Sequence, residues 1–167
     1  LLFSWSWSHL FFKVDSIFSK QTDFPNDLNN DRPHVVILYL TRDDFNEDYC
    51  QNCLLQNYSA YELVICDDSQ TQEYIDKINS FHKKYLANNT GGVKASICRR
   101  GKNNLKGYKA GNLNHAIKEY VSQDDWILIV DADDNLPDNY LSRLVSKIPM
   151  NDENVAFIQS SHRMEFP

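Results

Sequence analysis

The stretch WILIVDADD, residues 126–134, is a short apolar run that ends abruptly in acidic residues. A continuous run of this kind is typical of a strand buried on both faces of a parallel sheet. Asp131 and Asp133 stand two residues apart, and such residues project to the same side of an extended chain. Two carboxylates so placed can hold one hard cation, since Mg²⁺ uses one or two carboxylates plus substrate phosphates. The stretch therefore predicts a strand with a metal site at its carboxyl end.

Further apolar runs flank this stretch and alternate with segments of helical spacing. The expected strands cover 35–40, 63–66, 93–98, 126–130 and 155–158, and the expected helices cover 46–57, 72–86, 110–121 and 138–148. Strands that alternate with helices predict an α/β fold, with a mostly parallel sheet and right-handed crossovers.

Three of the expected strands end in acid. Thr41 and two aspartates follow the first strand, Asp67 and Asp68 end the second, and 131–134 follows the fourth. In open α/β sheets, ligands bind beyond the carboxyl ends of the strands, so this edge is the expected site. Clustered carboxylates repel one another unless a cation lies among them, which again favours a metal.

A basic segment, RRGKNNLKGYKAGNLN at residues 99–114, leads into the third helix. Glycines and the free N–H groups of a helix start attract phosphate, and Lys102, Lys106 and Lys109 add positive charge. On its own the segment is equally consistent with a solvated basic loop. Beside a carboxylate metal site, it fits the binding of a diphosphate.

Length and composition limit the class of protein. The 167 residues suit one domain of roughly 100–200 residues. With 42% apolar and 24% charged residues, the chain is neither disordered nor a coiled coil. The net charge of −6, from 17 basic and 23 acidic residues, does not favour a nucleic acid as partner. Four cysteines are too few for a disulfide scaffold, and we expect them to pack as small apolar residues.

The N-terminal segment 1–20 begins LLFSWSWSHLFF. No run of about 20 apolar residues is present, so no complete transmembrane helix is expected. Two interpretations stay open, a surface helix or the end of a membrane or interfacial helix, in which Trp5 and Trp7 would suit the interface. The polar segment 21–33 reads as a linker, and 34–167 as the folded domain.

Five segments taken together resemble the family 2 glycosyltransferases of the GT-A fold. They are TRDD at 41–44, ELVICDDS at 62–69, KAGNLNHAI at 109–117, WILIVDADDNLPDNYL at 126–141 and VAFIQSSHR at 155–163. The closest likeness is to the processive membrane synthases, such as the cellulose synthase catalytic subunit. The Arg-Asp at 42–43 departs from the family's usual Tyr-Asn, which leaves the choice of base open.

The resemblance implies a role for each matching residue. Thr41, Asp67 and Asp68 would line the uridine pocket, and Lys109 would reach the diphosphate. Asp131 would approach the ribose or diphosphate and, with Asp133, bind Mg²⁺ or Mn²⁺. The chain would then be the donor- and metal-binding part of a GT-A domain, a Rossmann-like mostly parallel sheet with flanking helices that is incomplete at its C-terminus.

The implied activity is inverting transfer of a sugar from a nucleotide-diphosphate donor to a hydroxyl of a glycan or lipid. UDP and glucose are the expected nucleotide and sugar, and the cytoplasmic face of the inner or plasma membrane is the expected location. Neither the family's acidic base motif nor its QxxRW motif occurs in the sequence, and both are expected downstream. We therefore expect the segment alone to bind donor and to transfer little.

Two alternatives remain at this stage. The chain could be a non-catalytic or truncated module that binds nucleotide sugars. It could also be a magnesium-dependent phosphatase of the haloacid dehalogenase type, which likewise uses an Asp-x-Asp motif. In those phosphatases the motif normally follows the first strand, whereas here it follows the fourth expected strand.

Overall fold

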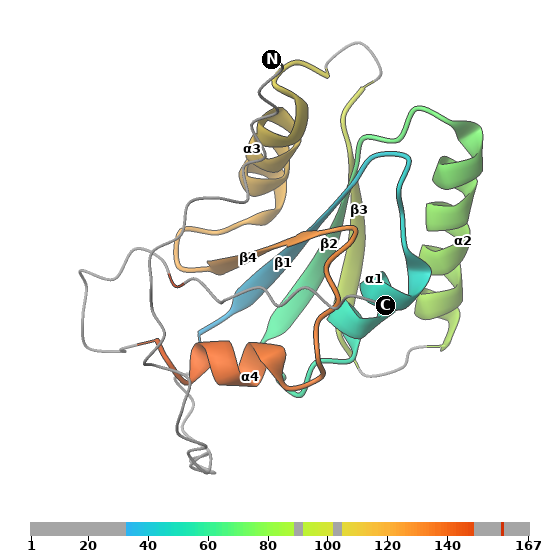
Figure 1. The fold of residues 1–167 in the computed structure, drawn as a ribbon. Coiled ribbons are helices and arrows are strands. Elements are labelled where there is room, and N and C mark those ends of the chain that lie inside the picture. Colours follow the sequence, from blue (N-terminus) through green and yellow to red (C-terminus); the bar gives the residue numbers. More distant parts are fainter. Residues whose placement is uncertain (1–32, 89–91, 102–104, 149–157, 159–167) are drawn as a thin grey trace, which may run out of the picture.

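Strands and helices alternate along the chain and form a parallel sheet with helices on both faces, as seen in a computed structural model (Figure 1). The described residues are 33–88, 92–101, 105–148 and 158. Their elements are β1 Val35–Thr41, α1 Glu47–Leu54, β2 Tyr61–Asp67, α2 Gln72–Asn88, β3 Lys94–Arg99, α3 Tyr108–Tyr120, β4 Trp126–Asp131 and α4 Tyr140–Val145. The sheet order is β3-β2-β1-β4, and every neighbouring pair is parallel.

The predicted α/β fold is confirmed. The predicted segment 1–20, most of the linker 21–33 and the strand 155–158, except Ile158, lie outside the described residues. Helix α1 ends earlier than predicted because Gln56 turns inward, where its side-chain amide donates to Pro137 O at 3.0 Å. The Gln56 Oε1 atom in turn accepts from Leu141 N at 2.9 Å, at the start of α4.

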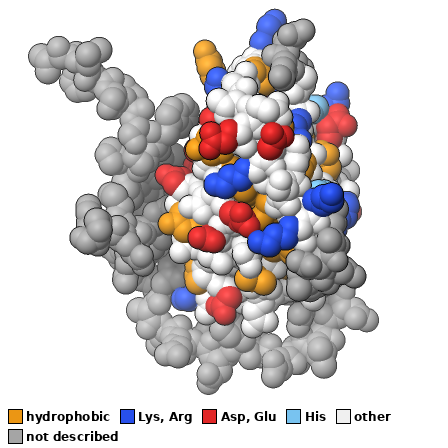
Figure 2. Space-filling model, turned by 90° about the vertical axis from the view of Figure 1, so that its right-hand side faces the viewer, with side chains coloured by type: hydrophobic (Ala, Val, Ile, Leu, Met, Phe, Trp, Pro, Cys, Tyr) orange, Lys and Arg blue, Asp and Glu red, His pale blue; other side chains and the backbone are white. Residues whose placement is uncertain are grey.

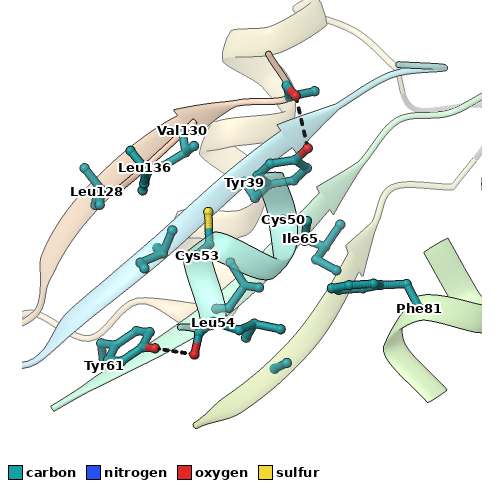
Figure 3. Close-up of a cluster of buried hydrophobic side chains, with 14 of the residues drawn as sticks. Tyr39, Cys50, Cys53, Leu54, Tyr61, Ile65, Phe81, Leu128, Val130 and Leu136 are labelled. Atoms are coloured by element: carbon teal, nitrogen blue, oxygen red, sulfur yellow. Dashed lines mark hydrogen bonds between the residues drawn. The ribbon is translucent and has the colours of Figure 1, made fainter. Parts of the chain in front are cut away.

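Alternate residues of β1 enter two separate apolar clusters. Val35, Ile37 and Tyr39 pack with side chains of α1, α2 and α4 on one face (Figure 3). Val36 and Leu38 pack on the other face against α3. All five side chains are almost fully buried. Burial of an apolar side chain of this size adds roughly 1.5–3 kcal/mol to the free energy of unfolding. The central strand thus joins three layers.

Strand β4 differs from the prediction of burial on both faces. Leu128 and Val130 are buried, but Ile127 and Ile129 are 37% and 50% exposed. These two side chains are exposed because β4 is the last strand of the described sheet, and α3 packs over β1, β2 and β3 instead.

Tyr39 connects three elements through its hydroxyl group at the end of a buried side chain (Figure 3). The oxygen lies 3.2 Å from both Asn46 O and Ala132 O, and accepts from Asn46 N at 3.3 Å. Burial raises the pKa of this phenol far above its usual value. Tyr39 therefore links β1 to the start of α1 and to the turn after β4.

Strand β3 is an edge strand of the sheet formed by the described residues, and side chains from both flanking helices bond to its backbone. His82 Nε2 of α2 donates to Ala95 O at 3.0 Å, and the Tyr120 hydroxyl of α3 donates to Ile97 O at 3.2 Å. The edge strand is thereby held between the two helix layers.

The face that carries α2 has acidic and basic side chains interspersed (Figure 2). Lys84 forms an ion pair with Glu47 at 3.1 Å, and Lys77 Nζ donates to Phe45 O at 3.2 Å, so both lysines join α2 to the α1 region. Among the described residues, no helix is long and apolar enough to cross a membrane.

Candidate functional site

The carboxyl ends of the strands meet at one edge, as predicted. The register places Thr41 beside Asp67, and Asp67 beside Arg99. Asp131 lies beside Leu40, the residue before Thr41. The sheet thus brings three of the predicted site residues, from three different strands, to the same edge.

Thr41 is buried, and its hydroxyl is used inside the loop between β1 and α1. It donates to Asp44 Oδ1 at 2.8 Å, and the same oxygen accepts from Arg42 N at 2.7 Å. Asp44 therefore holds this loop in its conformation.

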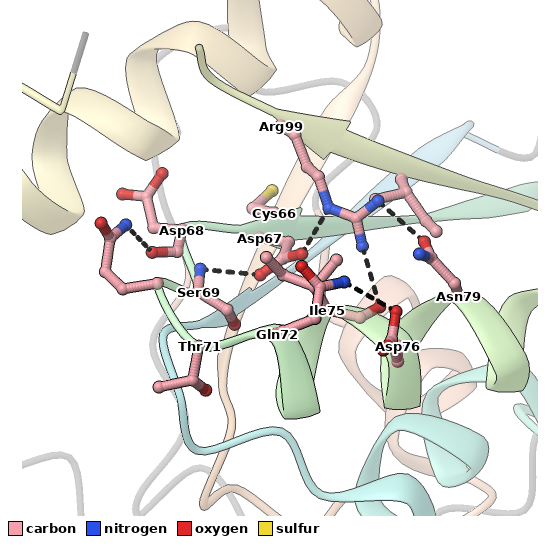
Figure 4. Close-up of polar contacts among 12 residues, drawn as sticks. Cys66, Asp67, Asp68, Ser69, Thr71, Gln72, Ile75, Asp76, Asn79 and Arg99 are labelled. Carbon is pink, nitrogen blue, oxygen red and sulfur yellow. Dashed lines mark hydrogen bonds and ion pairs between the residues drawn. The ribbon is translucent and has the colours of Figure 1, made fainter. Parts of the chain in front are cut away.

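The buried carboxylate of Asp67 forms an ion pair with Arg99, whose side chain is 33% exposed (Figure 4). Arg99 Nε lies 2.5 Å from Asp67 Oδ2, while Asp67 Oδ1 accepts from Ser69 N at 2.8 Å. Arg99 is itself oriented by Asn79 Oδ1 of α2, at 2.8 Å. The side chain of Asp67 is 1% exposed, so its bond to Ser69 N holds the loop after β2 from inside the fold.

Asp68 points away from the Asp67–Arg99 pair, toward the side of the sheet where α3 lies (Figure 4). Its carboxylate is bound by both Nε and Nη2 of Arg100, with 3.0 Å from Nε to Oδ1. The side chains of Asp68 and Arg100 are only 6% and 3% exposed.

Asp43 joins the first two strand-end loops. Its Oδ1 atom accepts from Gln70 N, Thr71 N and Thr71 Oγ1, each at 2.9 Å. These bonds, with that to the Thr71 backbone foremost, lower the pKa of the Asp43 carboxyl. The residue has φ of 58°, a left-handed conformation that aspartate tolerates better than most residues. We did not predict from the sequence that Asp43 joins these two loops.

Lys109 and Asp131 come together across the edge. Lys109 Nζ lies 2.5 Å from Asp131 Oδ1 and 2.6 Å from Oδ2, with the two side chains 59% and 42% exposed. Lys109 stands in the first turn of α3, directly after Gly107 and Tyr108, whose φ angles are 81° and 48°. This left-handed pair turns the chain into the helix, so that Lys109 faces the end of β4.

The Asp-x-Asp segment forms a tight turn, where the sequence predicted an extended chain. Asp134 N donates to Asp131 O at 2.9 Å, and Asp131 N donates to Asp134 Oδ2 at 3.1 Å. The chain therefore bends at Ala132 and Asp133, so the argument from strand alternation does not apply to this pair. Asp133 is exposed on this turn.

Residues 35–165 match the family model described as Glycosyl transferase family 2. The chain belongs to glycosyltransferase family 2. No curated protein matches it. Membership makes the chain a glycosyltransferase domain, which implies a nucleotide-sugar donor and an acceptor. Its parallel sheet with flanking helices is the GT-A, Rossmann-like arrangement expected from the sequence.

Three of the aspartates at the strand ends of this glycosyltransferase are paired with cationic side chains of the chain itself. Arg99 pairs with Asp67, Arg100 with Asp68, and Lys109 with Asp131. Repulsion among carboxylates therefore does not by itself require a metal. The sequence signal for the two arginine partners was available, because Arg99 and Arg100 stand together at the end of β3, the strand that neighbours β2.

The residues at the end of β4 nevertheless suit a hard cation. Within the described ranges, no group of three or more His, Cys, Asp or Glu side chains could hold a metal. A magnesium ion that also binds substrate phosphates needs only one or two carboxylates. Asp131 and Asp133 offer two accessible carboxylates on one turn of the glycosyltransferase, so their oxygen donors fit Mg²⁺ or Mn²⁺.

Proposed function

We propose that this glycosyltransferase binds a nucleotide-diphosphate sugar, with UDP-glucose as the favoured donor, at the carboxyl edge of its sheet. The observation that carries the proposal is the exposed Lys109–Asp131 pair. A lysine at a helix start and a carboxylate at a strand end lie in contact and open to solvent, so each can exchange its partner for a ligand. Lys109 would then bind the diphosphate, with the free N–H groups at the start of α3 beside it.

Asp131 and Asp133 would hold Mg²⁺ or Mn²⁺. When bound, such an ion neutralises charge on the leaving nucleoside diphosphate. Thr41, Asp67 and Asp68 would form the wall of the base pocket, kept in shape by the bonds of Asp43 and Asp44. We assign no catalytic base in this chain and expect donor binding with little transfer.

The acceptor in this proposal is a hydroxyl of a glycan or lipid, which attacks the anomeric carbon opposite the leaving diphosphate and inverts it. The KAGNLN segment followed by DAD supports a synthase of the processive membrane type, acting at the cytoplasmic face. Family membership argues against the phosphatase alternative.

The first test is thermal unfolding of the chain with UDP, GDP, ADP or CMP, with and without Mn²⁺. A ligand at a hundredfold excess over Kd adds about 2.7 kcal/mol to the free energy of unfolding. We expect UDP to stabilise the chain only with Mn²⁺, and Asp133→Asn to abolish the effect. Asp124→Asn, an exposed residue before β4, is the matched control and should keep it. A folded chain that shows no metal-dependent nucleotide effect would contradict the proposed donor site.

A further inference from the structure

Arg100 ties the end of β2 to the loop that carries Lys109. Besides its two bonds to Asp68, Arg100 Nη1 donates to Lys106 O at 2.7 Å and Nη2 donates to Tyr108 O at 3.1 Å. These two carbonyl groups flank the left-handed residues Gly107 and Tyr108. A non-glycine residue such as Tyr108 keeps a positive φ only where its surroundings enforce it, and Arg100 supplies bonds on both sides.

Gly111, in the first turns of α3, makes room for this arrangement. A Cβ atom at Gly111 would lie 2.5 Å from Arg100 Nη1 and 2.0 Å from Lys106 O. Any side chain there would push the guanidinium group away from the carbonyl that it binds. The arginine and the glycine therefore form one fitted unit behind Lys109.

Asp68 completes this unit from the strand side. Both carboxylate oxygens bind Arg100, and the side chain is 6% exposed, so little of the carboxylate faces the open edge. We propose that Arg100 is a positioning residue that acts through Lys109: held by Asp68 from the strand side, it sets the ammonium group of Lys109 against the donor diphosphate. This inference rests on the proposed function, because it takes the diphosphate as the partner of Lys109.

A double-mutant cycle on the full chain tests the inference. UDP and GDP affinities are measured by calorimetry with Mn²⁺ for the starting protein, Arg100→Lys, Lys109→Ala and the double variant. Lysine keeps the charge beside Asp68 but lacks the planar fork that reaches both carbonyls. We expect Arg100→Lys to weaken UDP binding about tenfold, the size of one charge-assisted hydrogen bond. In the Lys109→Ala background the same change should have almost no further effect.

The ratio of UDP to GDP affinity tests whether Arg100 also acts on the base. Positioning through Lys109 predicts that both nucleotides weaken equally, so the ratio stays constant. Additive effects in the cycle, or a changed ratio, would overturn the inference and place Arg100 against the base. Should Arg100→Lys unfold, Gly111→Ala, which crowds Arg100 away from Lys106 O, must give the same pattern, and circular dichroism checks each variant. Arg143→Lys, exposed on α4, is the matched control. If the starting protein itself bound neither nucleotide, the proposed function would fail instead.

Discussion

Gly111 has no space for a side chain, and this gives a prediction at the scale of one residue. We expect Gly111→Ala to lower the free energy of unfolding by about 1–3 kcal/mol, because overpacking forces the backbone or Arg100 to move. Urea unfolding followed by circular dichroism measures the change. Gly101→Ala is the matched control, since a Cβ atom there meets nothing within 4 Å. Equal effects of the two substitutions would contradict the close contact at Gly111.

At the same scale, the sequence located the site but not its internal bonds. The family motifs and the ends of the expected strands pointed to Asp67, Asp68, Lys109 and Asp131 as site residues. The structure places all four at the carboxyl edge of the sheet. The arginine partners were missed because pairing depends on which strands are neighbours. A hydrophobic period along the chain marks strands, but it does not give their order in the sheet.

Among the elements, the junction of β1, α1 and the turn after β4 depends on one hydroxyl group. We expect Tyr39→Phe to lower the free energy of unfolding by about 1–3 kcal/mol, because it removes the hydroxyl that bonds the partly buried Asn46 N and the carbonyl of the buried Ala132. Thermal unfolding measures the loss. Tyr108→Phe, at a side chain 74% exposed, should be close to neutral. A Tyr39→Phe protein as stable as the original would show that the hydroxyl contributes nothing.

The ends of the helices were harder to predict from the sequence than the positions of the strands. Strands β1, β2 and β4 were located because each contains a continuous apolar run, although the run in β4 is buried on one face only. Helix α1 is shorter than its helical spacing suggested, since the buried Gln56 bonds to Pro137 O and Leu141 N. Helix α4 ends at Val145, where Lys147 N and Ile148 N bond to carbonyl groups only three residues earlier. A side chain that satisfies another element's backbone leaves no periodic trace in the sequence.

For the whole molecule, burial of all four cysteines gives a chemical measure of folding. Burial raises the pKa of Cys98 to about 11 and that of Cys53 to about 12. Because only the thiolate reacts, and a raised pKa leaves these groups protonated at pH 8, we expect the folded chain to resist a thiol reagent. Addition of denaturant should release four reactive thiols. Rapid labelling before denaturation would mean that the apolar clusters open readily.

The bonds that His82 and Tyr120 make to β3 also bear on how separate molecules meet. An extended segment from another chain that approached this edge would find two of the carbonyl groups already occupied. Strand addition, the usual route from an open sheet edge to aggregation, would first have to displace side chains anchored in two helices. Side chains of the chain itself therefore shield two carbonyl groups of this edge from strand addition.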